Sequence, residues 1–276
     1  MRVLDGFNVV NVALNLPGPL CCERLTGLGA QVTKVEPPAG DPMTTYDPAL
    51  YARMRAGQEV RVLDLKTPTD AEVLRSLLDR ADLLVTSQRP SARARLGLDV
   101  DTLRERHPRL CGVHIVGSTR QPEEPGHDLT YQAALDLLNP PHMPRMLLAD
   151  IAGAELAARK AVEALFARER GLGTTHVNVG LEDAAEAFTV SWRHGLTRPG
   201  ALLGGGFSGY AIHRTADGWI AVGALEPHFQ HRLAQVLGVA LEADEAVRAR
   251  FRRDTTAHWL ALAAERDLPI TALPGA

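Results

Sequence analysis

The sequence has few cysteines, no long apolar run and no excess of basic residues, and each absence excludes a class of protein. Its three cysteines provide neither a disulfide framework nor the spacing of metal ligands, so we expect no metal site and a reducing cytoplasm. No run approaches the roughly 18 apolar residues of a membrane span, and the N-terminus lacks the basic start and apolar core of a signal peptide. A formal charge of −3 argues against nucleic-acid binding.

The dinucleotide fingerprint G-x-G-x-x-G is also missing. Gly18, Gly27 and Gly29, the glycines near the first expected strand, have the wrong spacing for it. We therefore expect no nicotinamide cofactor.

Strand and helix patterns alternate in the first two thirds of the chain. Residues 7–14 are alternating and β-branched, residues 21–30 are helical in pattern, and residues 31–35 form a second expected strand. A further strand, helix and strand follow in residues 61–90, then an amphipathic helix with its lead-in in residues 92–110 and a strand over 110–117. Short connections of this kind favour an α/β fold with an open, mostly parallel sheet.

A linker at residues 192–200 divides the 276 residues into two expected domains. Residues 1–190 form a large α/β domain and residues 191–276 a smaller α+β domain. The second domain contains the turn signal TADG between two alternating segments, which predicts a hairpin with strands at 210–214 and 219–223.

The stretch from Gly126 to Gly153, GHDLTYQAALDLLNPPHMPRMLLADIAG, contains the candidate chemistry. His127 ionises near neutrality, and Asp150 has apolar neighbours that are expected to raise its pKa by desolvation. The two side chains are candidates for an acid/base pair. The structural alternative is that Asp150 is the N-cap of the following helix and that His127 braces a turn.

The pair GHDLTY and LLADIAG resembles the signature of the family III CoA-transferases (CaiB/BaiF), and specifically of their α-methylacyl-CoA racemase branch. The opening strand with its PGP turn, the KVE strand end, VLDLK-TP and GALEPHF extend the similarity over nearly the whole chain. The resemblance implies an open Rossmann-like sheet with a second, smaller α+β domain. It also implies that the C-terminus is shortened relative to the family.

The resemblance assigns roles to five residues. His127 and Asp150 would lie on the two faces of the substrate α-carbon and exchange its proton. Glu226, from GALEPHF, would orient and charge His127, while Tyr131 would support the pair by hydrogen bonding. The backbone N–H near Asp128 would donate to the enolate oxygen.

The same resemblance predicts coenzyme A as part of the substrate, with no covalently bound cofactor. Lys66 and Arg89 match basic residues that contact the CoA phosphates, and Lys34 lies at a strand end where open α/β sheets bind ligands. Two segments depart from the family pattern. Ala56, Gly57 and Gln58 replace an Arg-Gly-Lys, and only the glycine survives of a Ser-Gly-Phe-Gly-Gln loop at residues 116–120.

Three functions remain open at this point. The first is an acyl-CoA racemase or epimerase that acts on 2-methylacyl-CoA-type thioesters by 1,1-proton transfer. The second is a CoA-transferase in which Asp150 is the nucleophile and forms a mixed anhydride, although that branch typically lacks the histidine of GHD. The third is a degenerate homologue without catalysis, as the departures would allow. For the enzyme, the family implies an interlocked homodimer in which Glu226 meets His127 of the partner.

Overall fold

The computed structural model describes residues 1–274, and the chain divides into two compact units, Met1–Phe188 and Thr189–Ala276. The division lies two residues before the boundary expected from the sequence. Each unit is described by itself below. In the described part of the chain, no helix is long and apolar enough to span a membrane.

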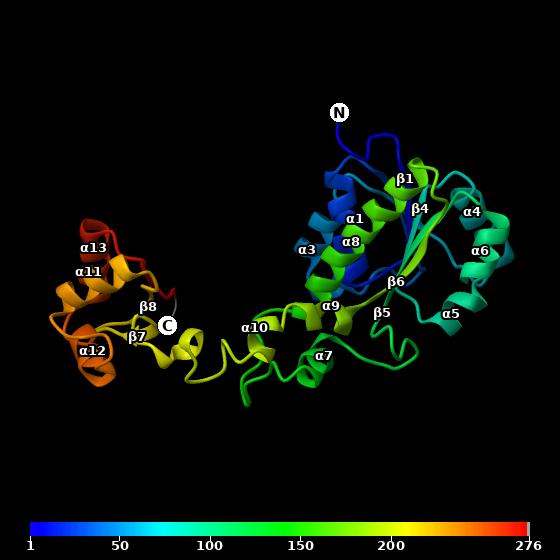
Figure 1. Ribbon diagram of the computed structural model, residues 1–276. Helices are drawn as coiled ribbons and strands as arrows, with labels where there is room; N and C mark the ends of the chain where they lie inside the picture. Colours follow the sequence, from blue (N-terminus) through cyan, green and yellow to red (C-terminus); the bar gives the residue numbers. More distant parts are fainter. Residues whose placement is uncertain (275–276) are drawn as a thin grey trace. The chain divides into compact units, whose positions relative to one another are not determined.

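The first unit is built on a six-stranded sheet in which every neighbouring pair of strands is parallel (Figure 1). The strand order is β3-β2-β1-β4-β5-β6. The strands are β1 (Asn8–Asn11), β2 (Gln31–Glu36), β3 (Glu59–Val62), β4 (Leu83–Thr86), β5 (Cys111–Val116) and β6 (His176–Gly180). The prediction of an open parallel α/β sheet is therefore confirmed.

Helices cover both faces of this sheet. The helices of this unit are α1 (Pro17–Gly27), α2 (Met43–Tyr46), α3 (Pro48–Met54), α4 (Pro68–Leu78), α5 (Pro90–Arg95), α6 (Val100–Arg106), α7 (Asp128–Ala134), α8 (Leu148–Glu169) and α9 (Leu181–Ala187). Figure 1 shows α1 and α8 on one face and α4 and α6 on the other. Each face has its own core, because β4 is buried on both sides: Leu83 packs towards α1 and α8, and Leu84 towards α4 and α6. Such two-sided burial is typical of parallel sheets.

The sequence predicted one amphipathic helix with its lead-in over residues 92–110, and the structure has two helices in this region, α5 and α6. Gly97 adopts φ +68°, a left-handed conformation that ends α5. The side chain of Asp99 then accepts the N–H of Thr102 at 3.0 Å and caps α6. The amphipathic pattern continues across this break, so periodicity alone does not reveal it.

The second unit has a three-stranded antiparallel sheet, in the order β7-β8-β9, that packs against helices. Its elements are α10 (Val190–Arg193), the irregular turn η1 (Leu202–Gly206), β7 (Tyr210–Arg214), β8 (Trp219–Gly223), α11 (Pro227–Leu237), α12 (Asp244–Phe251), α13 (Thr256–Arg266) and β9 (Ile270–Ala272). Both hairpin strands have the predicted bounds. Ile220, Leu233, Phe251 and Trp259 are buried together in its core. The prediction of a small α+β domain is confirmed.

Candidate active site

His127 is the residue that begins α7. Its backbone is extended, with φ −141° and ψ 166°, as expected for an N-cap position. Its N–H donates to the hydroxyl of Thr130 at 3.0 Å, and that hydroxyl donates to the carbonyl of His127 at 2.8 Å. These two bonds fix the backbone of His127 and leave its side chain exposed.

The carboxylate of Asp128 is buried, with 4% of the residue exposed, and it binds the start of another helix. Its Oδ1 accepts the N–H of Ala149 at 2.7 Å and of Asp150 at 3.2 Å. Its Oδ2 accepts from Nε2 of Gln132 at 2.5 Å. The N-cap residue of α8 is Leu147, which has no polar side chain, so Asp128 satisfies N–H groups that an N-cap side chain ordinarily satisfies.

Asp150 therefore lies inside the first turn of α8 and is not its N-cap, which corrects the structural alternative derived from the sequence. Burial raises the pKa of Asp150 to about 6, and the negative charge of Asp128 adds to this shift. His127 acts in the opposite direction. The predicted desolvation of this carboxylate is present, and His127 is close enough to interact with it electrostatically.

Two glycines leave room for the Tyr131 ring near this pair. A Cβ added at Gly117 would meet the Tyr131 hydroxyl at 2.3 Å, and one at Gly126 would meet the ring at 2.4 Å. Burial raises the pKa of Tyr131, the charges of Asp150 and Glu182 raise it further, and Arg89 opposes them. Within residues 1–274 no group hydrogen-bonds the Tyr131 hydroxyl, so the expected hydrogen bond to the pair is not formed here.

A third glycine explains the spacing of the D-x-x-G segment. A Cβ at Gly153 would lie 2.2 Å from Cδ2 of Leu181, so a larger residue here would require this methyl group at the α8–α9 contact to move. The close approach brings Glu182 of α9 near Tyr131. Helix α8 therefore bears Asp150, and helix α9 places Glu182 near Tyr131.

The candidate site therefore gathers five of the residues singled out in the sequence. His127, Asp128, Tyr131 and Asp150 lie together, and Arg89, the exposed residue before α5, is near enough to influence Tyr131.

The other three predicted residues belong to other segments of the chain. Lys66 is exposed in the turn after β3. Glu226 is exposed at the N-cap of α11 in the second unit.

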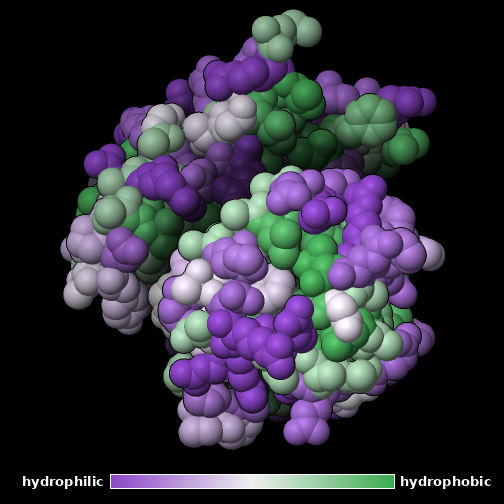
Figure 2. Space-filling model, turned by 90° about the vertical axis from the view of Figure 1, so that its left-hand side faces the viewer, coloured by the Kyte–Doolittle hydropathy of each residue, from purple (hydrophilic) through white to green (hydrophobic). Residues whose placement is uncertain are grey.

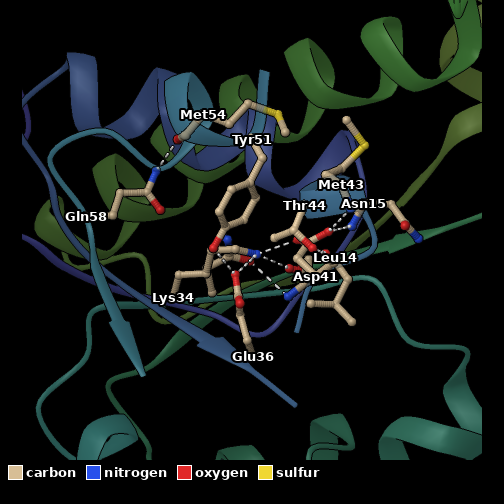
Figure 3. A network of polar contacts seen from close by, with 12 residues as sticks. Leu14, Asn15, Lys34, Glu36, Asp41, Met43, Thr44, Tyr51, Met54 and Gln58 are labelled. Atoms are coloured by element: carbon tan, nitrogen blue, oxygen red, sulfur yellow. Dashed lines mark hydrogen bonds and ion pairs between the residues drawn. The ribbon is translucent and has the colours of Figure 1, made fainter. Parts of the chain in front are cut away.

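Lys34 lies in a buried network at the end of β2 (Figure 3). It is 1% exposed, and its Nζ lies 2.7 Å from Oδ2 of Asp41 and 3.4 Å from Oε1 of Glu36. Tyr51 donates its hydroxyl to the same Glu36 oxygen at 2.8 Å, and Asp41 accepts the N–H of Asn15 at 3.1 Å. Because these carboxylates already pair with the Lys34 ammonium inside the protein, the geometry weighs against its predicted contact with a CoA phosphate.

Comparison with known proteins places this arrangement in a family. The sequence pattern of CoA-transferase family III matches residues 4–273. The chain belongs to CoA-transferase family III.

Relatives in this family include both racemases and transferases. Human α-methylacyl-CoA racemase is 34% identical over 261 residues, covering 88% of this chain and 66% of the human protein. A probable fatty acyl-CoA transferase of Mycobacterium tuberculosis is 27% identical over 308 residues, covering 98% of this chain and 77% of that protein. The chain thus spans slightly less than two thirds of the human racemase.

The fold of family III is likewise shared with a solved structure. A hypothetical protein from Mycobacterium tuberculosis superposes with a TM-score of 0.86 at 25% identity, covering 98% of this chain and 85% of that chain. Among residues 1–274, no group of three or more His, Cys, Asp or Glu side chains is arranged to hold a metal ion.

The two departures from the family III pattern have structural counterparts. Gln58, in place of a lysine, donates its amide to the carbonyl of Met54 at 2.8 Å. In the loop after β5, the N–H of Thr119 donates to Asp183 at 2.7 Å. The neighbouring Arg120 lies 3.0 Å from Glu186 and 3.8 Å from Glu182, so this loop is fastened to α9.

Sequence reasoning missed two residues of the candidate site. Gln132 is 4% exposed and donates to Asp128 and to the carbonyl of Met146, 2.9 Å away. A glutamine four positions after an aspartate on a helix is a detectable signal, because residues i and i+4 share a helix face. Glu182 had no such signal, since its proximity to Tyr131 depends on the packing of α9.

Proposed function

We propose that this protein is an acyl-CoA racemase or epimerase that acts on 2-methylacyl-CoA-type thioesters by 1,1-proton transfer. His127 and Asp150 are the two acid/base groups, one for each face of the substrate α-carbon. Coenzyme A enters as part of the substrate, with Lys66 and Arg89 as its proposed phosphate contacts. No covalently bound cofactor is required by this chemistry.

The observation that carries the proposal is the raised pKa of Asp150 beside an exposed histidine. A general base is most effective when its pKa lies near the working pH, and about 6 satisfies that condition for a carboxylate. A pair of titratable groups with different environments is typical of an acid/base site. His127 supplies the second group, which the transferase branch typically lacks.

The reaction needs a place for the negative charge of the enolate oxygen. The N–H of Asp128 is the first of α7, and such N–H groups have no partner within their own helix. It is the proposed donor to the thioester oxygen, a kind of contact that is stronger in the transition state than in the ground state. Tyr131 is the proposed hydrogen-bonding support of the pair.

A homodimer in the cytoplasm is the proposed working form. Large hydrophobic side chains are exposed in the first unit on α7, on the first turn of α8, in the segment between these helices and at the end of the unit, and they are exposed in the first residues of the second unit: Leu129, Met143, Met146, Leu147, Ile151 and Phe188 in the first, Val190 and Leu202 in the second. Figure 2 also shows hydrophobic surface between hydrophilic side chains. Exposed apolar patches of this kind often mark protein interfaces. In the proposed dimer Glu226 of one copy approaches His127 of the other.

Deuterium exchange tests the proposed reaction. The protein is incubated with a (2R)-2-methylacyl-CoA in deuterated water, and α-deuterium incorporation is followed by NMR. We expect exchange in the wild type and a loss of about 10²–10⁴-fold in Asp150→Asn, the range that general acid–base groups contribute. Asp101→Asn is the matched control, because Asp101 is an exposed carboxylate in the first turn of α6.

The second candidate is a CoA-transferase in which Asp150 attacks the thioester carbonyl. The similarity to a probable fatty acyl-CoA transferase favours it. Its signature would be an acyl adduct on Asp150, detected by mass spectrometry after incubation with acyl-CoA, without α-deuterium exchange. Absence of exchange, adduct and thermal stabilisation by CoA would instead identify a homologue that has lost catalysis.

A further inference from the structure

The segment that bears Asp150 is held by a side chain from another helix. The first turn of α8 leaves its N–H groups without intrahelical partners, and Leu147 has no side-chain acceptor for them. Oδ1 of Asp128 accepts two of these N–H groups, at 2.7 Å from Ala149 and 3.2 Å from Asp150. The backbone of Asp150 is therefore bonded directly to Asp128.

The carboxylate of Asp128 is itself fixed on its other side. Gln132 lies one turn further along α7 and donates to Oδ2 at 2.5 Å. The same amide nitrogen donates to the carbonyl of Met146 at 2.9 Å, just before α8 begins. Asp128 and Gln132 thus join α7 to the start of α8 by three hydrogen bonds, and the bond between their own side chains lies within α7.

From these contacts we infer that the Asp128 side chain is a positioning residue for Asp150: it caps α8 from α7 and places a second negative charge beside the reacting carboxylate. The inference rests on the proposed function for the role of Asp150. It concerns the Asp128 side chain, whereas the role carried over from the family concerns the Asp128 backbone N–H.

The charged groups around Asp150 favour this assignment. On α7, Asp128 opposes the ionisation of Asp150 and His127 favours it. Tyr131 lies on the same helix, and α9 adds Glu182 near that tyrosine.

Two further cations lie on neighbouring elements. Arg89, before α5, acts on Tyr131. On α1, Arg24 pairs with Glu155 of α8 at 2.8 Å. Asp128 is therefore the nearby charge whose removal is expected to lower the titration midpoint of Asp150 most.

Two substitutions separate the cap from the charge. Asp128→Asn keeps an oxygen at Oδ1 for both N–H groups but removes the negative charge; Gln132 must then turn its amide and give up the bond to Met146. Asp128→Ala removes both the cap and the charge. Asp99→Asn is the matched control, because Asp99 is the N-cap of α6 and also accepts one N–H through its side chain.

The measurement is the titration of the Asp150 carboxyl in the full-length protein, by NMR with ¹³C-labelled aspartate and with Asp150→Asn for assignment. We expect Asp128→Asn to move the midpoint to lower pH and Asp99→Asn to leave it unchanged. If Asp128 acted on Asp150 only through its hydrogen bonds, and not through its charge, Asp128→Asn would not move this midpoint. Coincident titration curves for the wild type and Asp128→Asn would overturn the electrostatic part of the inference.

Thermal unfolding tests the cap. We expect Asp128→Ala to melt lower than Asp128→Asn by several degrees. The side-chain cap of a helix typically stabilises a protein by about 1 kcal/mol, and a chain of this size loses about 2–4 °C in melting temperature for each kcal/mol. Equal melting temperatures would overturn the positioning part. If Asp128→Ala does not fold, the Asp128→Asn titration still decides the electrostatic part.

The pH profile of deuterium exchange then tests whether the titration of Asp150 controls the reaction. Its acid limb is expected to shift with the NMR midpoint in Asp128→Asn. If the wild type shows no exchange at all, the proposed function fails, while the titration still reports on the Asp128 side chain without any substrate.

Discussion

Two clusters of carboxylates belong to the first unit, and they are built in opposite ways: Glu36, Asp41 and Asp128 are buried, and Asp150 is half-buried. At the end of β2, Glu36 and Asp41 pair with the Lys34 ammonium, and Tyr51 donates to Glu36. At the start of α8, Asp128 and Asp150 have no buried cation between them, and Asp128 is held by N–H groups and an amide. One cluster is charge-paired and the other is not.

This difference distinguishes carboxylates that stabilise the fold from carboxylates that can take part in a reaction. An ammonium inside the protein compensates the desolvation of its carboxylates and leaves them little freedom to exchange protons with a ligand. Desolvation without a buried cation makes ionisation of Asp150 unfavourable and raises its pKa, and the negative charge of Asp128 adds to this shift. Buried groups of the second kind are the better candidates for catalysis.

The largest expected effect comes from removing the cation of the paired cluster. Lys34→Met leaves Glu36 and Asp41 buried without their partner, so we expect a loss of about 3–5 kcal/mol in the free energy of unfolding, measured with urea. Lys66→Met is the control, because Lys66 is exposed, and it should change this free energy by less than about 0.5 kcal/mol. A similarly small loss in Lys34→Met would mean that the cluster is not structural.

Removing a charge from the unpaired cluster should increase the free energy of unfolding, whereas removing Lys34 should decrease it. The pKa of Asp150 rises from 3.8 to about 6 in the folded protein, so the stability linked to this proton is present below pH 3.8 and lost as the pH rises through 6. Asp150→Asn is neutral at every pH and avoids that loss. We therefore expect it to be more stable than the wild type by about 1–3 kcal/mol at pH 8 and about equally stable near pH 3.

Urea unfolding at the two pH values measures this prediction. Asp101→Asn, an exposed first-turn carboxylate, should show no such pH-dependent gain. A variant of Asp150 that is less stable than the wild type at pH 8 would contradict the desolvation of this carboxylate.

The sequence allowed one cluster to be anticipated better than the other. The stretch from Gly126 to Gly153 has local signals, namely a turn, a histidine and a carboxylate at a helix start, and the structure brings its members together. The pairing of Lys34 with Asp41 was not anticipated, because a strand-end lysine has the same sequence pattern whether it is solvated or buried. The cap of α8 by Asp128 was not anticipated either, since 21 residues separate Asp128 from Ala149.

The same limit applies to the fold. The hairpin strands at Tyr210–Arg214 and Trp219–Gly223 were predicted with their bounds, because a tight turn between alternating segments is a local feature. The break between α5 and α6 was missed, since Gly97 interrupts an amphipathic pattern that continues beyond it. Contacts between distant segments and interruptions within a pattern are where sequence reasoning fails.

The smallest expected change in the free energy of unfolding comes from removing one tyrosine hydroxyl in or near each cluster. Tyr51 donates to Glu36 at 2.8 Å, and its pKa is raised to about 12 by burial and by this bond. Tyr51→Phe should cost about 1–2 kcal/mol in the free energy of unfolding, because the bond is to a charged acceptor. The hydroxyl of Tyr131 has no hydrogen-bond partner in residues 1–274, so Tyr131→Phe should change this free energy by less than about 0.5 kcal/mol.

The effects of the two substitutions on the rate of deuterium exchange are expected in the reverse order, with Tyr131→Phe the more affected. Tyr131→Phe should slow deuterium exchange because Tyr131 lies beside Asp150 and its hydroxyl remains available to a bound substrate, whereas Tyr51→Phe should exchange at the wild-type rate wherever it is folded. Unfolding curves and exchange rates of the two variants, measured side by side, give four values. If Tyr51→Phe loses exchange and Tyr131→Phe does not, the paired cluster serves the reaction, and the division between structural and chemical carboxylates is wrong.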